Sequence, residues 1–385
     1  MPSLPVRSTS LALLLTTCCV AEVAAQTTWI VDQAGGPGSQ FTNLTPAIAA
    51  ASDGDLILIR PGNYAEGQLD VDKGLTILGE TGVVVTMNVF GTAGMTIHDV
   101  PATSAFAMRD LRIGGQLAGP PVAIVDCAGL VLLDKLEGPI GGLGLPENFG
   151  VHVESCQQVH LHGLLVRGGQ SVRFENSVGT VTRCTLEGGI AGVAQLVDSD
   201  VTFDRSVVNI EPTVSFAPPM QVDGGRVTLS RSSVEAPISP QTPHPAIVTQ
   251  GSAELRVDPT ASLVPTAGQP AISGPAIVSN GEVDTLSRDG TGVITFDLHG
   301  RAGSIYGSYA TLPAATTALP FGVLWLDLNP AVQLPITAGV VTTRQQSFTL
   351  DTTPLPLGLR FVVQAGVLDP SLTLALSNGV GALAN

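Results

Sequence analysis

Basic residues are scarce in this sequence, and lysine is almost absent. The 385 residues include 17 lysines and arginines against 32 aspartates and glutamates, which gives a formal net charge of −15. The only lysines are Lys73 and Lys135. Nucleic acids and anionic membranes both require a clustered positive field on the protein that binds them. The charge balance therefore argues against both classes of partner.

Aromatic and charged residues are also few, at 4% and 13% of the chain, whereas the sequence has 44 glycines and 28 prolines. Runs of helix-forming residues with amphipathic spacing are almost missing. After the N-terminus, no segment is long and apolar enough to span a bilayer. A composition rich in Gly, Thr, Ser, Val and Pro is typical of all-β proteins with many turns. We therefore expect an all-β fold without a membrane span.

The first 25 residues have the features of a secretory signal peptide. A weakly basic start precedes a short apolar core at residues 11–15, and the Val-Ala-Ala run at 23–25 is a small-residue cleavage pattern. We predict cleavage before Gln26 and a protein that is secreted, either extracellular or at the cell surface. A lipoprotein anchored through Cys18 is the alternative, although Thr17 matches poorly the residue expected before such a cysteine.

The main body of the sequence repeats a short pattern of two alternating strands separated by a polar turn. Clear copies begin at residues 151, 172, 197 and 222, and weaker copies lie at 104–115, 122–138 and 246–263. Aligning the copies places five apolar residues in one column, at steps of 28, 20, 22 and 26 residues: Leu133, Leu161, Val181, Phe203 and Leu229. A constant strand pattern with a variable step is what stacked rungs with loop insertions produce. A β-propeller blade would need about 40 residues or more.

Three cysteines remain after the predicted cleavage, and this odd number does not describe a disulfide framework. In the rung alignment Cys127, Cys156 and Ser177 share one position, and Cys184 lies at another. We interpret the shared position as a column of small buried residues, because a free cysteine behaves as a small hydrophobe. A disulfide between neighbouring parallel strands is the alternative.

The segment before the rungs contains a specific order of motifs. A short helix is expected at 45–52 with Thr45 as its N-cap, followed by a turn and an apolar strand at 53–59. The runs PGNYAE at 61–66 and KGLTILGE at 73–80 come next. This order resembles the opening of the pectin lyase-like superfamily, which pectinesterases share with many secreted proteins of unassigned function. The resemblance implies a right-handed parallel β-helix with an N-terminal cap over residues 26–292. It implies no activity, since one fold carries many functions.

From about residue 293 the strand pattern changes. Longer strand-like runs, separated by turns rich in Pro and Gly, lie at 294–298, 321–328, 347–352 and 359–367. They predict a small antiparallel module over 293–385 that is similar to a β-sandwich. Its phrases resemble a β-rich module found at the C-termini of secreted bacterial proteins. Such a module can cap the solenoid, mediate sorting or bind a surface component.

The catalytic strings of enzymes that share the β-helix fold are missing. The motifs of pectinesterases, polygalacturonases and pectate lyases do not occur in the sequence. Asp198 and Asp200 are expected in a turn, where aspartate commonly bonds its own backbone. We therefore interpret both as structural rather than as a glycosidase pair. Asp204 is expected on a strand and is the better candidate of the three.

Two histidines form a second candidate site. Their neighbours are expected to point inward, so His160 and His162 point outward, two residues apart on one face. Such a pair can chelate zinc or copper if a third ligand, such as His152 or Glu154, is supplied. Outward histidines are more often simply solvated, so we predict no metal and no cofactor.

A row of arginines is the third candidate. The alignment places Arg183, Arg205 and Arg231 at the bend between two strands in successive rungs, ~5 Å apart. Like charges that close repel one another unless carboxylates interleave, and Asp204 is adjacent to Arg205. The same row could line a groove for an acidic polysaccharide, because guanidinium groups bind carboxylates in bidentate pairs. A solvated row that is balanced by local acids is nevertheless the favoured interpretation, and the groove is the alternative.

Taken together, the sequence favours a secreted, non-catalytic β-helix protein that is structural or binds glycans. Its expected partner is an acidic polysaccharide or a cell-surface component. The alternative is a divergent polysaccharide lyase or hydrolase that acts on an acidic polysaccharide. The missing motifs and the presence of only two tryptophans for sugar stacking favour the first hypothesis. The candidate ligand-binding residues are Arg183, Arg205, Arg231, Asp204, His160 and His162.

Overall fold

The computed structural model describes residues 26–89, 91–114, 119–140, 149–189, 192–210, 217–237, 243–327, 329 and 333–384. The predicted signal peptide lies outside these residues, so its cleavage and the export that it implies remain predictions. Within the described ranges, no helix has the length and apolar character needed to cross a membrane.

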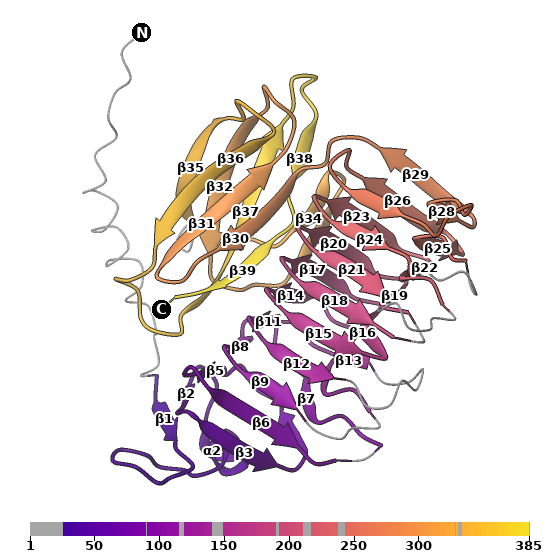
Figure 1. The fold of residues 1–385 in the computed structure, drawn as a ribbon. Coiled ribbons are helices and arrows are strands. Elements are labelled where there is room, and N and C mark those ends of the chain that lie inside the picture. The colour runs from indigo at the N-terminus through magenta and orange to yellow at the C-terminus, as the bar shows by residue number, and fades with distance from the viewer. Residues whose placement is uncertain are drawn as a thin grey trace.

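Three parallel sheets form the main body of the molecule, and successive strands of the chain pass from one sheet to the next (Figure 1). Sheet A has eleven strands: β1 (Thr28–Val31), β2 (Leu56–Ile59), β5 (Thr76–Gly79), β8 (Ala105–Arg109), β11 (Leu130–Asp134), β14 (Gln158–His162), β17 (Val178–Thr182), β20 (Asp200–Asp204), β23 (Arg226–Ser230), β26 (Ala253–Val257) and β29 (Ala276–Asn280). Sheet B has nine: β3 (Gly62–Glu66), β6 (Val83–Met87), β9 (Arg112–Gly114), β12 (Glu137–Ile140), β15 (Leu165–Gly168), β18 (Thr185–Gly188), β21 (Val207–Ile210), β24 (Ser233–Glu235) and β27 (Ser262–Val264). Sheet C also has nine: β4 (Leu69–Val71), β7 (Met95–His98), β10 (Val122–Val125), β13 (Phe149–Glu154), β16 (Gln170–Glu175), β19 (Ala194–Val197), β22 (Met220–Asp223), β25 (Ile247–Gln250) and β28 (Ile272–Ser273).

The register of sheet A confirms the column that the rung alignment predicts. Leu133 pairs with Leu161, Leu161 with Val181, Val181 with Phe203, and Phe203 with Leu229. All five side chains are buried in one continuous core. The fold is therefore the parallel β-helix that the resemblance to the pectin lyase-like superfamily implies. Connections between parallel strands of one sheet are almost always right-handed.

The bends between sheets require a left-handed backbone, which few residues adopt readily. Asp126, Asn176 and Asp198 adopt it with φ of 52°, 47° and 46° just before strands of sheet A. Aspartate and asparagine tolerate this region because their short side chains bond locally. The structural interpretation of Asp198 agrees with this position. Asp200, in contrast, is the first residue of β20 and not part of the turn.

The stacked small residues lie in the core, as the rung alignment predicts. Cys127 and Cys156 are fully buried, and Ser177 is nearly so. The hydroxyl of Ser177 accepts a hydrogen bond of 3.0 Å from the N–H of Cys156. All three cysteines of the described chain are free. The column is thus filled by small buried side chains and contains no disulfide.

The first rung is covered by the short helix α2 (Leu44–Ala50), through its buried residues Leu44, Ala47 and Ile48. The predicted N-cap at Thr45 is wrong: the N-cap is Asn43, whose side chain makes no capping bond. Instead, the carboxylate of Glu66 accepts hydrogen bonds of 2.7 Å from the N–H of Leu44 and from the hydroxyl of Thr45. Strand β3 carries this carboxylate to the helix N-terminus, where negative charge is favourable.

Antiparallel sheets make up the C-terminal module. One contains β30 (Thr285–Asp289), β31 (Val293–His299) and β36 (Gln345–Asp351); another contains β35 (Leu334–Val340), β32 (Ile305–Thr311), β37 (Arg360–Leu368), β38 (Leu374–Leu376) and β39 (Val380–Leu383); a hairpin joins β33 (Thr317–Leu319) and β34 (Gly322–Leu324). The predicted boundary at residue 292 falls in the turn of the β30–β31 hairpin, because parallel pairing already ends at β29. Leu286 is the only strongly apolar residue of β30, so the sequence pattern there carries little signal.

The module packs along one flank of the β-helix, on the outer face of sheet A (Figure 1). The outward residues of the first rungs are apolar. Leu78 and Leu132 pack in one cluster with Leu383 of β39. Leu130 packs in another with Trp325 and with residues of β37. All five residues of β8 and of β11 are consequently buried, although each strand has both inward and outward positions. The module therefore covers the flank of the solenoid.

Candidate functional site

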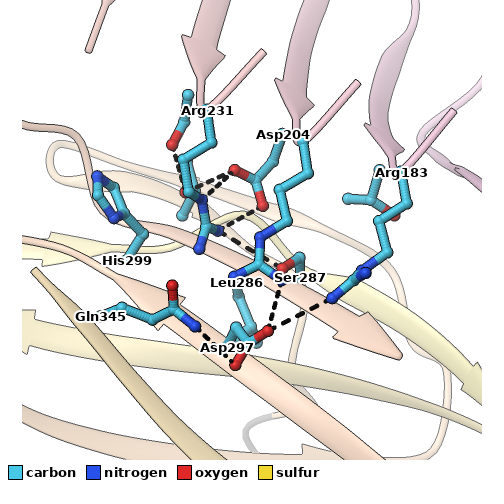
Figure 2. A network of polar contacts seen from close by, with 12 residues as sticks. Arg183, Asp204, Arg231, Leu286, Ser287, Asp297, His299 and Gln345 are labelled. Atoms are coloured by element: carbon cyan, nitrogen blue, oxygen red, sulfur yellow. Dashed lines mark hydrogen bonds and ion pairs between the residues drawn. The ribbon is translucent and has the colours of Figure 1, made fainter. Parts of the chain in front are cut away.

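The predicted arginine row lies beside the module. Arg183 and Arg205 adopt the left-handed backbone at their bends, and Figure 2 shows the side chain of Arg183 directed toward Asp297 of the module. A guanidinium nitrogen of Arg205 lies 2.6 Å from Asp297 of β31, and Arg183 lies 3.1 Å from Asp289 and 3.5 Å from Asp297. Burial alone raises the pKa of Asp297, but the hydrogen bond from Ser347 and the charge of Arg205 hold it below its usual value.

Arg231 and Asp204 form a bidentate pair within the same row. The Nε and Nη2 atoms of Arg231 donate to the two carboxylate oxygens of Asp204 at 2.8 and 2.5 Å. Asp204 is fully buried, and the hydroxyl of Thr285 in β30 also donates to it at 3.5 Å. Asp204 therefore serves as an internal counter-ion, held between the solenoid and the module.

Arg183, Arg205 and Arg231 are partly exposed, and each is paired with a carboxylate. Two of the carboxylates that interleave with them, Asp289 and Asp297, come from the module. The signal in the sequence for this covering is the apolar character of the outward positions of β8 and β11. Strands that are apolar on both faces are typical of sheets covered on both sides. Ligand binding by the row stays a prediction, and an acidic ligand would have to displace these carboxylates.

His160 and His162 point outward from the β-helix as predicted, but the expectation that they are solvated is wrong. Their exposed fractions are 0% and 2%, because the module covers them. The ring of His160 bonds the carbonyl of Gly381 at 3.0 Å and the hydroxyl of Thr182 at 2.9 Å. Burial and the nearby charge of Arg288 lower the pKa of His160 to about 3. Both rings are therefore buried where sheet A contacts the module, and their role there is structural. Within the described residues, the one group of potential metal ligands does not include them.

Past this contact, the module and sheet A leave a cleft of about 220 Å³. One wall is the outer face of sheet A, where Thr180, Thr202 and Thr228 pair in register on successive strands. The opposite wall belongs to the module and includes Phe321, whose ring is 38% exposed, and Asn378. Each threonine precedes a residue of the apolar column by one position, so its outward direction follows from the rung alignment, whereas no local pattern indicates which segment faces it.

Ion pairs line the solenoid side of the cleft. Arg226 lies 3.3 Å from Asp200 and 2.9 Å from Glu254, and Arg256 lies 2.8 Å from Glu254. These pairs are partly exposed, so each adds little to stability. Burial raises the pKa of Asp200, although Arg226 opposes the shift. The pairs hold the two guanidinium groups in place at the cleft.

Asp284 lies in the linker between β29 and β30 and lines the same cleft. Burial and the negative charges of Asp369 and Glu282 raise its pKa to about 6. Near neutral pH this carboxyl is therefore partly protonated and can both donate and accept hydrogen bonds. A buried carboxyl with a raised pKa in a cleft is a recognised sign of a functional site.

No protein-family model and no curated protein matches the chain. Two solved structures are similar to it over most of their own length. A pectin methylesterase from Aspergillus niger is 12% identical with a TM-score of 0.35, and the match covers 68% of this chain and 86% of the esterase. The A-module of the mannuronan C-5 epimerase AlgE4 from Azotobacter vinelandii is 10% identical with a TM-score of 0.27, covering 62% and 88%. At these values the fold assignment rests on the strand register of the chain itself.

Proposed function

We propose that this chain is an exported carbohydrate-binding protein and that the cleft between sheet A and the module is its binding site. The observation that carries the proposal is the convergence of three kinds of group on one cleft. These are the threonine hydroxyls, the paired charged side chains and an exposed aromatic ring. Such a mixture of an apolar surface and a few oriented polar groups is typical of small-molecule sites.

Each group suits a sugar for a different reason. The hydroxyls of Thr202 and Thr228 both donate and accept, as sugar hydroxyls do, whereas that of Thr180 is buried and donates to the carbonyl of Gly379. Paired strands place such positions ~4.8 Å apart, so they form a repeated set of contacts along the solenoid axis. The ring of Phe321 offers an apolar face to the C–H surface of a pyranose. A chain of sugar units fits this arrangement better than a compact polar metabolite does.

The charges of the cleft favour a neutral carbohydrate over the acidic polysaccharide that the sequence suggests. Arg226 and Arg256 are already paired with Asp200 and Glu254, and Glu282 is paired with Arg344 at 2.7 Å. A polyuronate would have to displace Asp200 and Glu254 from the two arginines and would lie beside the carboxyl of Asp284. We therefore expect binding of neutral glycans that is weakly dependent on salt concentration.

Affinity electrophoresis of the purified chain in gels that contain neutral or acidic polysaccharides tests the proposal. We expect retardation by a neutral glycan, and about tenfold weaker binding in Phe321→Ala. Tyr309→Ala is the matched control, because Tyr309 is 40% exposed on the same module but does not line the cleft. Equal loss in both variants, or no retardation by any neutral glycan, would contradict the proposal. Salt-sensitive binding of an acidic glycan that is lost in Arg205→Ala would instead support the arginine row.

One observation favours hydrolysis as a second candidate function. Asp284, with its pKa raised to about 6, has the property expected of a general acid, and Asp200 lines the same cleft. If the chain cleaves the glycan that it binds, Asp284→Asn should abolish turnover and leave binding intact. Binding without any release of reducing ends by the unaltered protein would leave the non-catalytic function.

A further inference from the structure

A second polar cluster lies on the outer face of sheet C. Strands β13 and β16 are parallel neighbours, and their register places His152 opposite Arg173 and Glu154 opposite Glu175. Val151 and Val153 point into the core, so the alternate residues His152 and Glu154 project outward together. The four side chains are therefore neighbours on the outer face of sheet C, two on each strand.

Three of these four side chains carry metal-ligating atoms that are close to one another. One ligand atom each from His152, Glu154 and Glu175 lies within 4.8 Å of the other two. The Nε2 atom of His152 is 4.0 Å from a carboxylate oxygen of Glu175. Around a tetrahedral ion with bonds of 2.0–2.1 Å, ligand atoms are about 3.3 Å apart. Small rotations of these half-buried side chains are sufficient to reach that distance.

The fourth side chain, Arg173, makes an ion pair with Glu175, so its guanidinium occupies part of the space near the carboxylates. Arg173 therefore competes with a cation for Glu175.

We propose that His152, Glu154 and Glu175 form a binding site for a divalent transition-metal ion such as zinc. Imidazole nitrogen selects zinc and related ions over calcium and magnesium, which prefer oxygen ligands. Three protein ligands leave a fourth tetrahedral position for water or for an oxygen of a bound molecule. The site lies on sheet C, whereas the cleft lies against sheet A, so the two proposals do not depend on each other.

Isothermal titration of the chelator-treated, tag-free chain with Zn²⁺ tests the site. We expect one ion per chain, with little heat from Ca²⁺ under the same conditions. Loss of one ligand should weaken binding by more than about 100-fold, since loss of an outer-shell partner alone typically costs about 10–100-fold. Both His152→Ala and the nearly isosteric Glu175→Gln should show this loss, so a folding defect in one variant leaves the other as a test.

Two further variants make the experiment specific. Arg173→Gln should bind Zn²⁺ about threefold to tenfold more tightly, because it removes a neighbouring positive charge and the competitor for Glu175. His98→Ala is the control, since His98 lies on the same sheet beside Asp70 and Asp99. Absence of Zn²⁺ binding would show that the cluster is an ion-pair network only. Loss of Zn²⁺ binding in His98→Ala but not in His152→Ala would show that the ion binds at His98, which would overturn the proposal.

Discussion

At the scale of single residues, Asp204 and Arg231 form an ion pair within the β-helix, beside the module. Asp204 is fully buried, and both of its oxygens accept hydrogen bonds from Arg231. Removing one member of a buried ion pair leaves an uncompensated charge and typically costs about 3–5 kcal/mol. We expect Asp204→Ala to lower the free energy of unfolding by about 3 kcal/mol, measured by urea denaturation.

Glu235→Ala is the matched control for this prediction. Glu235 is an exposed carboxylate on the last rungs of sheet B, so its removal should change the free energy of unfolding by less than about 0.5 kcal/mol. Similar effects of the two substitutions would mean that the buried pair does not stabilise the fold.

The pH dependence of stability should report the burial of His160. The pKa of His160 falls from 6.5 to about 3 on folding, so the unfolded chain binds a proton more readily than the folded chain. The contribution of the neutral histidine is therefore fully present above pH 6.5 and is lost as the pH falls toward 3. Between pH 7 and pH 5 this one group should cost about 2 kcal/mol. We expect a smaller loss over that interval in His160→Gln, measured by denaturation at each pH. A steeper loss in the variant would contradict this assignment.

At the scale of single elements, β17 depends on a glycine. A Cβ added to Gly179 would lie 2.6 Å from a ring carbon of Phe174, which fills the core at this rung. Overpacking of a core typically costs about 1–3 kcal/mol. We expect Gly179→Val to destabilise the chain by at least that amount in thermal unfolding. Gly366→Ala in β37 is the control, because a Cβ there meets no atom within 4 Å. A neutral effect of Gly179→Val would show that the solenoid core is looser than the structure indicates.

At the scale of the whole molecule, the module shields an apolar flank of the β-helix. Outward residues of the first rungs, including Leu78, Leu130 and Leu132, pack in clusters with residues of the module. A chain that ends at Asn280 would expose them as a continuous patch, and large exposed apolar patches promote association. We expect this truncated chain to bind a hydrophobic dye strongly and to aggregate, whereas the full chain stays monomeric at the same concentration. A monomeric truncated chain without added dye binding would contradict the assignment.

The rungs were predictable because a solenoid is held together by contacts between neighbours. Leu161 packs on Leu133 and Val181, and all three are found by an alternating pattern that repeats within about 30 residues. The bends at Arg183 and Arg205 follow from the same alignment. The helix cap was less predictable, since Glu66 reaches α2 from a later strand. The start of the antiparallel strands at β30 is hard to predict, because this strand carries little apolar signal.

The sequence by itself determined the β-helix, its inward columns and the row of residues at its bends, since these depend on local alternation and on like residues stacking between rungs. Only the tertiary structure decided what each outward face does. Docking of the module joins segments far apart in the chain, such as Asp297 with Arg205 and Gly381 with His160. Such contacts depend on the complementary shape and charge of two folded surfaces, which no local pattern contains. They paired the row of arginines with carboxylates of the module and left the cleft beside Phe321 as the candidate binding site.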